Sequence, residues 1–408
     1  MTTEQRPLLL HIMTVPLSLR FFQGQPRFMR EHGIDVRVMC SPGPELEDFV
    51  SAEKVVGYAV PISRRISPAE DLVSLVRMVR IAQRVKPDVI HSHTPKGGLL
   101  GMLTATIVGT PLRIYHLRGL RYAESTGARR KLLRSLDRLC CALAHRVICV
   151  SSSIRDAAVA DGLCEADKIR VLGKGSGQGV DANGRFNPAN FPASVRRRVR
   201  AELGIPQDSL VVGFVGRIVR DKGMIELANA WRKISPSFPD AHLLIVGPFE
   251  PEDPVPAEVA DYFRTTPTIH LAGKREDTPE LYSAMDVVVL PTYREGFPNV
   301  PLEAAAMGLA VIATSVPGCI DAVEDGVTGS LIPPRDPDAL AEAITKYLAD
   351  PELRRSRGAA GRARVLRDFT REAVWRALLP EYHALFAARG IRLGVAEGAA
   401  RAGETSNA

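Results

Sequence analysis

A regular alternation of short apolar runs with longer amphipathic stretches is the feature that most constrains the fold of this chain. The runs have the length of single strands, and the segments between them have helical periodicity, as in residues 69–85 with Leu72, Leu75, Val76 and Val79. Strands separated by helices need crossover connections, so the alternation predicts parallel sheets covered by helices. The predicted strands are residues 8–13, 36–40, 89–91, 113–116, 147–150, 211–215, 243–246, 268–271, 287–290 and 311–313.

The alternation pauses between residues 172 and 192, where residues 173–179 are dense in glycine, and this segment is expected to link two domains. A length of 408 residues also exceeds what one ordinary core organises. The predicted fold is therefore α/β, with two doubly wound, Rossmann-like domains facing a cleft. We expect an N-terminal domain over residues 1–180, a C-terminal domain over 181–368, a closing helix over 369–392 and a flexible tail over 393–408.

Charge and cysteine content narrow the class of protein. The formal net charge of +7 describes a basic surface that could face nucleic acid, anionic lipid or a phosphorylated substrate. No nucleic-acid-binding signature accompanies this charge, so nucleic acid is not an expected partner. No apolar run approaches the roughly 20 residues that span a bilayer, and the N-terminus does not resemble a signal peptide. Because the six cysteines include no CxxC pair, we expect a reduced, cytoplasmic protein with buried thiols.

The segment after the ninth predicted strand has the form of a loop that leads into a helix, which is predicted over residues 302–307. Backbone amides at such a helix start bind phosphate, so Asn299 and Val300 are candidate ligands. Glu295 on the loop and Glu303 in the first helical turn are eight residues apart, so they can touch two parts of one elongated ligand. The alternative is that Glu303 only complements the helix dipole and Glu295 is a solvated loop residue.

A second strand-to-helix turn follows the sixth predicted strand and carries two cations. Gly216 begins this turn, Arg217 follows it, and Lys222 precedes the next helix. Cations held at the end of a strand would stabilise the negative charge that develops on a leaving nucleoside diphosphate without a metal ion. The alternative is a pair of ordinary surface cations. No Asp-x-Asp motif stands in the context of a metal site, so neither a metal nor another cofactor is expected.

Taken together, these motifs resemble the donor domain of GT-B glycosyltransferases of family four, and the resemblance covers nearly the whole chain. The N-terminal half resembles the branch that extends undecaprenyl-diphosphate-linked sugars in capsule, exopolysaccharide and glycan-precursor synthesis. The resemblance implies that the first domain binds the acceptor, that the second binds a nucleotide sugar, commonly UDP-linked in this branch, and that the closing helix crosses back to the first domain. The motifs that carry the resemblance are Gly216-Arg217, Lys222-Gly223 and Glu295-x7-Glu303 in the second half, and residues 11–21, 91–98 and 117–122 in the first.

The resemblance also implies a role for each matching residue. Glu295 would contact hydroxyls of the donor sugar, Glu303 the ribose, and Arg217 and Lys222 the diphosphate, with the amides of the following helix assisting. The anomeric configuration would be retained by front-face attack, in which a diphosphate oxygen helps to deprotonate the acceptor. Glu295 is then a positioning residue and not a nucleophile.

The first domain supplies further candidates and two departures from the family. Many relatives place a glycine pair near the diphosphate, whereas this chain has Gly24 alone as a phosphate-cradling amide. Many also carry a histidine where this chain has Arg118, a permanent cation that would suit a phosphate on donor or acceptor. His91 and His93 are expected to point to opposite faces of a strand, with His93 facing the cleft. Lys96 would bind an acceptor phosphate or be an ordinary surface lysine.

The basic stretch 129–139 is a predicted helix with its leucines on one face. It is either a core helix with a solvated basic face or a contact with anionic lipid at the inner face of the cytoplasmic membrane. Three functions stay open at this point. They are sugar transfer to a lipid-diphosphate-linked acceptor, the same chemistry on a soluble small molecule such as a natural product, and nucleotide-sugar binding without turnover.

Overall fold

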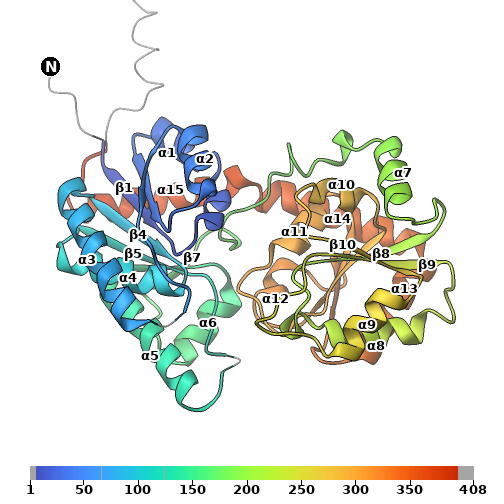
Figure 1. Ribbon diagram of the computed structural model, residues 1–408. Coiled ribbons are helices and arrows are strands. Elements are labelled where there is room, and N and C mark those ends of the chain that lie inside the picture. The colour runs from blue at the N-terminus through green and yellow to red at the C-terminus, as the bar shows by residue number, and fades with distance from the viewer. Residues whose placement is uncertain (1–5, 66, 124, 394–408) are drawn as a thin grey trace, which may run out of the picture. The chain divides into compact units, whose positions relative to one another are not determined.

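The computed structural model describes residues 6–65, 67–123 and 125–393. The chain forms two compact units: the first contains the chain up to Gln178 together with the part from Trp375 onward, and the second is Gly179–Val374 (Figure 1). The division after Gln178 falls inside the glycine-dense segment. The last helix, α15 (Arg371–Ala387), gives most of its length to the first unit. Each unit is built on one parallel sheet, so the predicted α/β class is confirmed.

The first unit has seven strands: β1 (Leu8–Ile12), β2 (Asp35–Cys40), β3 (Val56–Ala59), β4 (Val89–His93), β5 (Leu112–Leu117), β6 (Arg146–Cys149) and β7 (Ile169–Val171). Their order in the sheet is β3-β2-β1-β4-β5-β6-β7. The chain first winds outward from β1 and then resumes at β4 in the other direction. Ligand sites of doubly wound sheets lie at the carboxyl ends of the strands where the direction changes, which here is between β1 and β4.

The second unit has six strands: β8 (Leu210–Val215), β9 (Ala241–Val246), β10 (Ile269–Gly273), β11 (Val287–Leu290), β12 (Ala310–Thr314) and β13 (Gly329–Ile332). Their order is β10-β9-β8-β11-β12-β13, so the winding direction changes between β8 and β11. Both strands are almost wholly buried. The strand order of the second unit repeats that of the first six strands of the first unit. Its switch point lies next to the two predicted ligand-binding loops.

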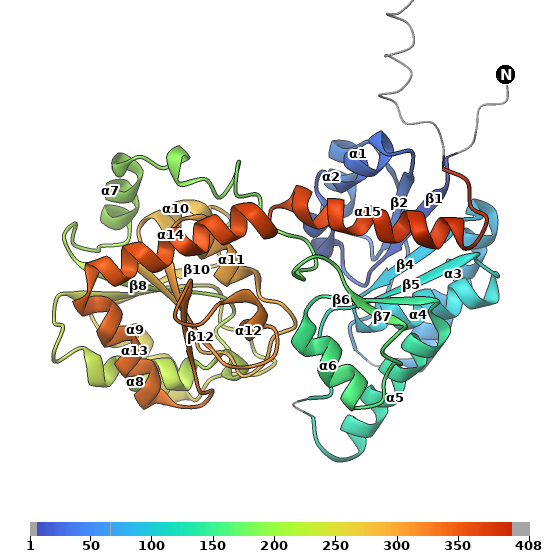
Figure 2. The ribbon, with the colours of Figure 1, turned by 180° about the vertical axis from the view of Figure 1, so that it is seen from behind.

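Helices cover both faces of each sheet. In the first unit, Met29 and Tyr382 pack on one face, whereas Leu100 and Cys140 pack on the other, so α15 completes a face of the first sheet (Figure 2). The remaining helices are α1 (Gln25–Glu31), α2 (Pro44–Glu53), α3 (Pro68–Val85), α4 (Pro95–Ile107), α5 (Gly127–Leu143), α6 (Ser152–Ala160), α7 (Ala193–Glu202), α8 (Met224–Ile234), α9 (Ala257–Thr265), α10 (Thr278–Ser283), α11 (Asn299–Ala306), α12 (Cys319–Ala322), α13 (Pro337–Ala349) and α14 (Pro351–Asp368), with short 3-10 helices η1 (Pro16–Phe22), η2 (Pro188–Asn190) and η3 (Arg220–Lys222).

The buried faces of two surface helices differ from the prediction. α3 packs through residues such as Ser74 and Met78, and Leu72 is left 62% exposed. On α5, Leu132 and Leu139 are both exposed, so the leucines of this helix do not form a single core face. Both helices thus carry apolar side chains on their outer surface.

None of the helices in the described part of the chain is long and apolar enough to cross a membrane. Five of the six cysteines are buried, and all six are free thiols.

Candidate active site

The switch point of the second unit brings together the loops that follow β8 and β11. Gly223, at the end of the first loop, has a φ of 70°, and a Cβ at this position would overlap the carbonyl oxygen of Pro291 on the second. The amide of Tyr293 also donates to the carbonyl of Asp221 at 2.8 Å. Only glycine fits such a left-handed and crowded position. This close approach determines where the side chains of the loop after β8 lie relative to those of the loop after β11.

Lys222 and Glu295 form an ion pair across these two loops. Their side chains are 17% and 16% exposed, so water screens the pair only in part. The two residues that were predicted to contact neighbouring parts of one ligand therefore lie side by side. A ligand that carries both an anionic group and hydroxyl groups can engage both residues at once.

Arg217, on the same loop as Lys222, pairs with Glu250 from the loop after β9, at 2.8 Å between a guanidinium nitrogen and Oε2. These side chains are 47% and 31% exposed, so this pair is the more accessible of the two. The amide of Gly216 donates to the carbonyl of Val246 at 2.9 Å. The amide of Gly216 is thus engaged inside the unit, and the role of this residue in donor binding stays a prediction.

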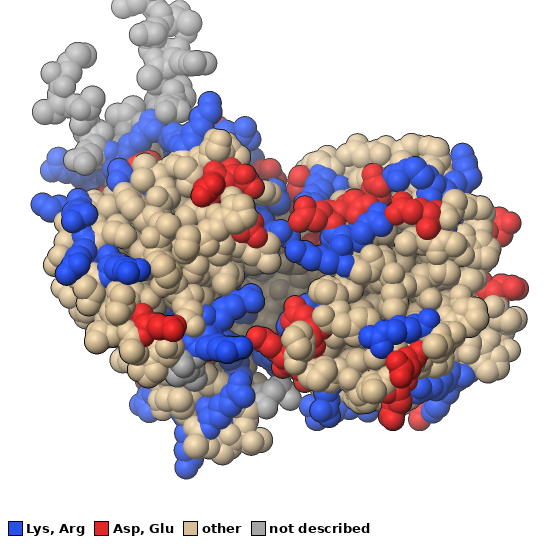
Figure 3. Space-filling model, in the orientation of Figure 1, with Lys and Arg blue, Asp and Glu red and all other residues tan. Residues whose placement is uncertain are grey.

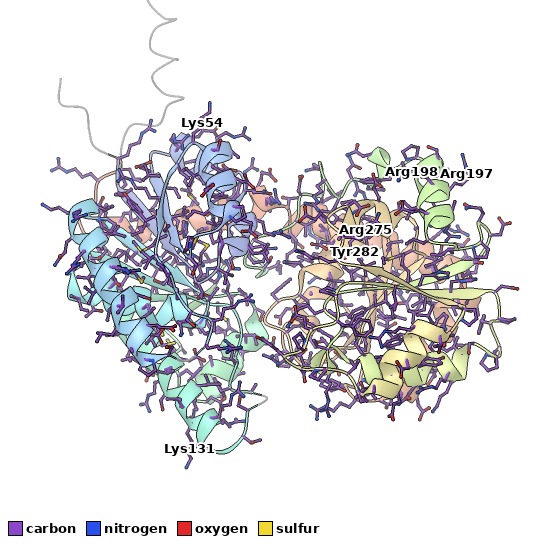
Figure 4. The ribbon with its side chains drawn as sticks, viewed as in Figure 1. Lys54, Lys131, Arg197, Arg198, Arg275 and Tyr282 are labelled. Carbon is purple, nitrogen blue, oxygen red and sulfur yellow. The ribbon has the colours of Figure 1, made fainter. Side chains whose placement is uncertain are left out.

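Glu303 lies in the second turn of α11 and not in the first turn as predicted, because the helix begins at Asn299, three residues earlier than expected. Tyr282, which is labelled in Figure 4, is a fully buried residue of α10. Its hydroxyl donates to Glu303 Oε2 at 3.0 Å. Burial raises the pKa of Glu303, and the hydrogen bond from Tyr282 opposes this. The carboxylate keeps lone pairs for further hydroxyl groups. The amides of Asn299 and Val300 open α11, and phosphate binding by them stays a prediction.

Four buried histidines line the ends of β1, β4 and β5 in the first unit. The prediction that His91 and His93 point to opposite faces is wrong, because residues two apart on a strand share a face. The centroids of their rings lie 4.2 Å apart. His11 pairs with His91 in the sheet register, and His93 with His116, which completes the cluster. Burial lowers the pKa of all four, that of His11 to about 3, so the imidazoles are neutral near pH 7.

Arg118 determines where protons lie in part of this cluster. A guanidinium only donates, so its contact with His93 Nδ1 at 3.5 Å assigns the proton of His93 to Nε2. That Nε2–H donates to His11 Nδ1 at 2.8 Å. Nitrogens of His11, His91 and His93 lie within 4.8 Å of one another, close enough for a metal ion. A metal would have to displace the Nε2 proton beside a guanidinium cation, so the geometry favours a hydrogen-bonded chain of imidazoles over a metal site.

Arg118 itself is well placed to bind an anion. Its guanidinium lies 5.9 Å and 5.7 Å from the ring centroids of Phe21 and Phe22 and donates to the carbonyl of Gly177 at 3.3 Å. Burial lowers its pKa to about 10, so it stays charged near neutral pH. Within residues 6–65, 67–123 and 125–393, no carboxylate is ion-paired with it. A half-buried cation whose partners are neutral attracts an anionic group.

Two other predicted residues of the first unit are engaged in structural contacts. The amide of Gly24 donates to Glu53 Oε1 at 2.7 Å, and a Cβ on Gly24 would stand 2.8 Å from the Trp375 ring. The Gly24 amide is therefore engaged by a carboxylate, and its predicted contact with a phosphate stays a prediction. Lys96 pairs with Asp71 at 2.8 Å, with only 15% and 21% of the two side chains exposed. Lys96 links α4 to α3 and is not an ordinary surface lysine.

Glu250, Tyr282 and His11 belong to these sites but were not among the predicted residues. The position of Glu250 could have been found from the sequence. Arg217 follows the predicted strand 211–215, and Glu250 follows the next predicted strand, 243–246, so the two loops are expected at the same edge of the sheet. The sequence holds no such signal for Tyr282, because it reaches Glu303 from a short helix 21 positions earlier in the chain.

The fold and the sites together define the class of protein. Two doubly wound units with charged residues at the switch points form the GT-B architecture of glycosyltransferases. Among solved structures, Anabaena Alr3699/HepE in complex with UDP-glucose is similar in fold, with a TM-score of 0.77 and 20% identity over 92% of this chain and 99% of that one. The sucrose-phosphate synthase from Thermosynechococcus elongatus gives a TM-score of 0.76 and 23% identity, over 94% of this chain and 100% of that one.

Sequence comparisons identify the family. The model of the glycosyl transferase 4-like domain matches residues 22–175, and that of the glycosyl transferases group 1 matches residues 209–350. The chain belongs to the group 1 glycosyltransferases and is a glycosyltransferase, as predicted.

Similar proteins include the capsular polysaccharide biosynthesis glycosyltransferase CapM of Staphylococcus aureus, 34% identical over 375 residues that cover 91% of this chain and 96% of CapM. The UDP-Gal:alpha-D-GlcNAc-diphosphoundecaprenol alpha-1,3-galactosyltransferase of Escherichia coli is 26% identical over 363 residues, 86% of this chain and 90% of that protein. These relatives confirm the predicted resemblance to the capsule and exopolysaccharide branch.

Proposed function

We propose that this glycosyltransferase moves a sugar from a UDP-sugar to a hydroxyl of a lipid-diphosphate-linked saccharide, with retention of the anomeric configuration and without a metal ion. The observation that carries the proposal is the Lys222–Glu295 pair at the switch point of the second unit, with Arg217 on the same loop. The nature of the acceptor is supported by the E. coli relative, whose name specifies a diphosphoundecaprenol substrate.

The proposed donor site assigns one part of the nucleotide sugar to each side chain. Glu303, oriented by Tyr282, binds the ribose hydroxyls, and Glu295 binds hydroxyls of the sugar. Lys222 and Arg217 hold the diphosphate, whose charge attracts each cation away from its carboxylate. The first amides of α11 add donors at a helix N-terminus, where the dipole favours an anion.

The proposed reaction needs no covalent enzyme intermediate. The acceptor oxygen bonds to the anomeric carbon on the face that the diphosphate leaves, and the bond from that carbon to the diphosphate oxygen breaks. The acceptor proton passes to a diphosphate oxygen, so UDP is the product. Lys222 and Arg217 stabilise the charge that grows on the leaving group, which is the task a metal ion performs in other enzymes. Glu295 positions the sugar.

We assign the acceptor's diphosphate to Arg118 of the first unit, since this cation has neutral neighbours and a half-buried position. His93 supports Arg118 through the contact between their nitrogens. A lipid-linked acceptor also requires proximity to a membrane. Cations gather over the lower end of the first unit, where Lys131 lies at the tip of α5 (Figures 3 and 4). Exposed Leu132 and Leu139 accompany them, a combination that favours contact with anionic lipid.

A direct test measures ligand binding before activity. A nucleoside diphosphate that binds the folded state raises the melting temperature, and we expect UDP to give the largest rise. Transfer is then assayed with a panel of UDP-sugars and undecaprenyl-diphosphate-linked saccharides, with the anomeric configuration of the product read by NMR. Turnover on soluble acceptors alone, or an inverted product, would refute the proposal.

Membrane contact is tested separately by flotation with liposomes. We expect the protein to float with vesicles that contain anionic lipid and to stay below with neutral ones. Equal recovery in both cases would contradict a role for the basic surface of α5.

A further inference from the structure

We propose that Glu250 is a built-in counter-ion that competes with the diphosphate for Arg217 and so limits how tightly the enzyme holds its nucleoside diphosphate product. The inference rests on the proposed donor site. It concerns a residue that takes no part in the transfer itself.

The position of Glu250 is fixed by the fold. The loop after β9 runs beside the loop after β8, and the amide of Ile218 donates to the carbonyl of Pro248 at 2.8 Å. Beyond Glu250, the amide of Asp221 donates to Asp253 Oδ2 at 2.9 Å. Glu250 therefore lies between two anchors that join its loop to the loop of Arg217. The ion pair follows from this arrangement and is not a chance contact of two long surface side chains.

Gly247 allows the loops after β8 and β9 to approach each other closely. A Cβ on Gly247 would overlap the carbonyl oxygen of Gly216, so the two loops approach as closely as their backbones allow. Gly247 also has a φ of 146°, a conformation that side-chain-bearing residues rarely adopt. Glycine at position 247 therefore allows the loop that carries Glu250 to pack directly against the loop that carries Arg217.

The two ion pairs of the site differ in how easily they separate. Lys222 and Glu295 are largely shielded, whereas Arg217 and Glu250 are 47% and 31% exposed. Exposed ion pairs contribute little free energy because water and salt screen them. A diphosphate brings more negative charge to Arg217 than one carboxylate does, so it displaces Glu250 readily. The carboxylate remains tethered nearby and returns to Arg217 when the product dissociates.

The expected consequence is a change in affinity for UDP. Arg217 holds the diphosphate both in the donor and in the product, so a guanidinium without a competitor would slow product release. In Glu250→Gln the competing charge is absent while the side chain keeps its size. We expect about fivefold tighter binding of UDP, the scale of an exposed ion pair. The KM for the donor should fall, and inhibition by UDP should strengthen.

The test is a calorimetric titration of UDP into the wild type and four variants. Glu252→Gln is the matched control, because Glu252 is exposed on the same loop and its replacement changes the net charge equally. Arg217→Ala should weaken UDP binding. The double variant of Glu250→Gln and Arg217→Ala should bind UDP like Arg217→Ala alone, since Glu250 acts only through Arg217.

Each result has a defined meaning. Tighter binding in Glu250→Gln, with Glu252→Gln unchanged, supports the inference. Equal or weaker binding in Glu250→Gln, while Arg217→Ala binds poorly, overturns the inference and leaves the donor site intact, since Glu250 would then position Arg217 instead of competing for it. Unchanged UDP binding in Arg217→Ala removes Arg217 from the donor site, and the inference with it. A wild type that does not bind UDP refutes the proposed function itself.

Discussion

Replacing Glu303 with Gln separates what this residue does for the fold from what it does for nucleotide binding. Its carboxyl group has a raised pKa because it is partly removed from water, so ionising it lowers the stability of the folded protein. Gln has nearly the same shape, keeps an oxygen that can accept the hydrogen bond from Tyr282, and carries no charge. We expect Glu303→Gln to be more stable than the wild type near neutral pH and to bind UDP more weakly.

The pH dependence follows from the direction in which burial moves the pKa. Because the folded pKa of Glu303 lies above the unfolded one, its contribution to stability is full below the unfolded pKa and is lost as the pH rises through the folded pKa. The advantage of Glu303→Gln should therefore be largest near neutral pH and vanish in acid. A tenfold change in the ionisation equilibrium corresponds to about 1.4 kcal/mol, so the gain in the free energy of unfolding measures how far burial raises the pKa of Glu303.

The loss in binding is set by the change from a charged to a neutral hydrogen bond. Such bonds differ by about 1 to 1.5 kcal/mol, which is roughly a fivefold to tenfold weaker affinity for UDP. Turnover at saturating donor should change little, because a ribose contact is shared by the ground state and the transition state. Urea denaturation at several pH values, calorimetry with UDP and kcat measurements test these points together. Unchanged affinity with a large fall in kcat would refute the reasoning. As a control, Tyr282→Phe removes the hydroxyl that donates to the Glu303 carboxylate, so it should lower the free energy of unfolding.

Further predictions concern the remaining parts of the donor site. Lys222→Ala should lower kcat about 10²-fold, by analogy with the loss of one donor from an oxyanion hole, and near-normal turnover would contradict its role. Gly223→Ala should lower the melting temperature far more than Gly204→Ala: both glycines have positive φ, but only a Cβ at 223 meets the backbone of Pro291. Activity should persist after treatment with EDTA, and a loss that Mg²⁺ or Mn²⁺ restores would overturn metal independence. Arg118→Ala should raise the KM for a lipid-diphosphate acceptor much more than the KM for the UDP-sugar, and equal changes in both would argue against its assignment.

Much of the fold was predictable because its signals are local. The central strands begin with apolar residues, and β11, which is wholly apolar, begins and ends at the predicted residues. The strands that were missed lie at or near sheet edges and lack such runs: none of the residues of β3 is buried. α14 escaped prediction because it packs through positions such as Gly358 and Gly361, which leave no apolar periodicity.

The candidate site was predictable where a motif and the strand order agree. Lys222 and Glu295 follow strands that are far apart in the chain and adjacent in the sheet, so they meet. Contacts between loops were predictable only in part. The strand order places Glu250 near Arg217, but the ion pair itself and the carboxylate at the amide of Gly24 depend on how the loops pack. The error at His91 and His93 had a different origin, since the twofold period of a strand already places both on one face.

The hydrogen bond between His91 and Tyr382 joins residues 291 positions apart. It belongs to the face of the first sheet that α15 covers, where Leu378, Tyr382 and Phe386 pack against Leu9, Val89 and Ile114. During synthesis this sheet therefore leaves the ribosome early, but the part of its face that α15 covers stays open until the final helix emerges. The unit that is translated first is completed last, and a chain that terminates before Trp375 exposes a strip of apolar sheet to chaperones, proteases and other nascent chains.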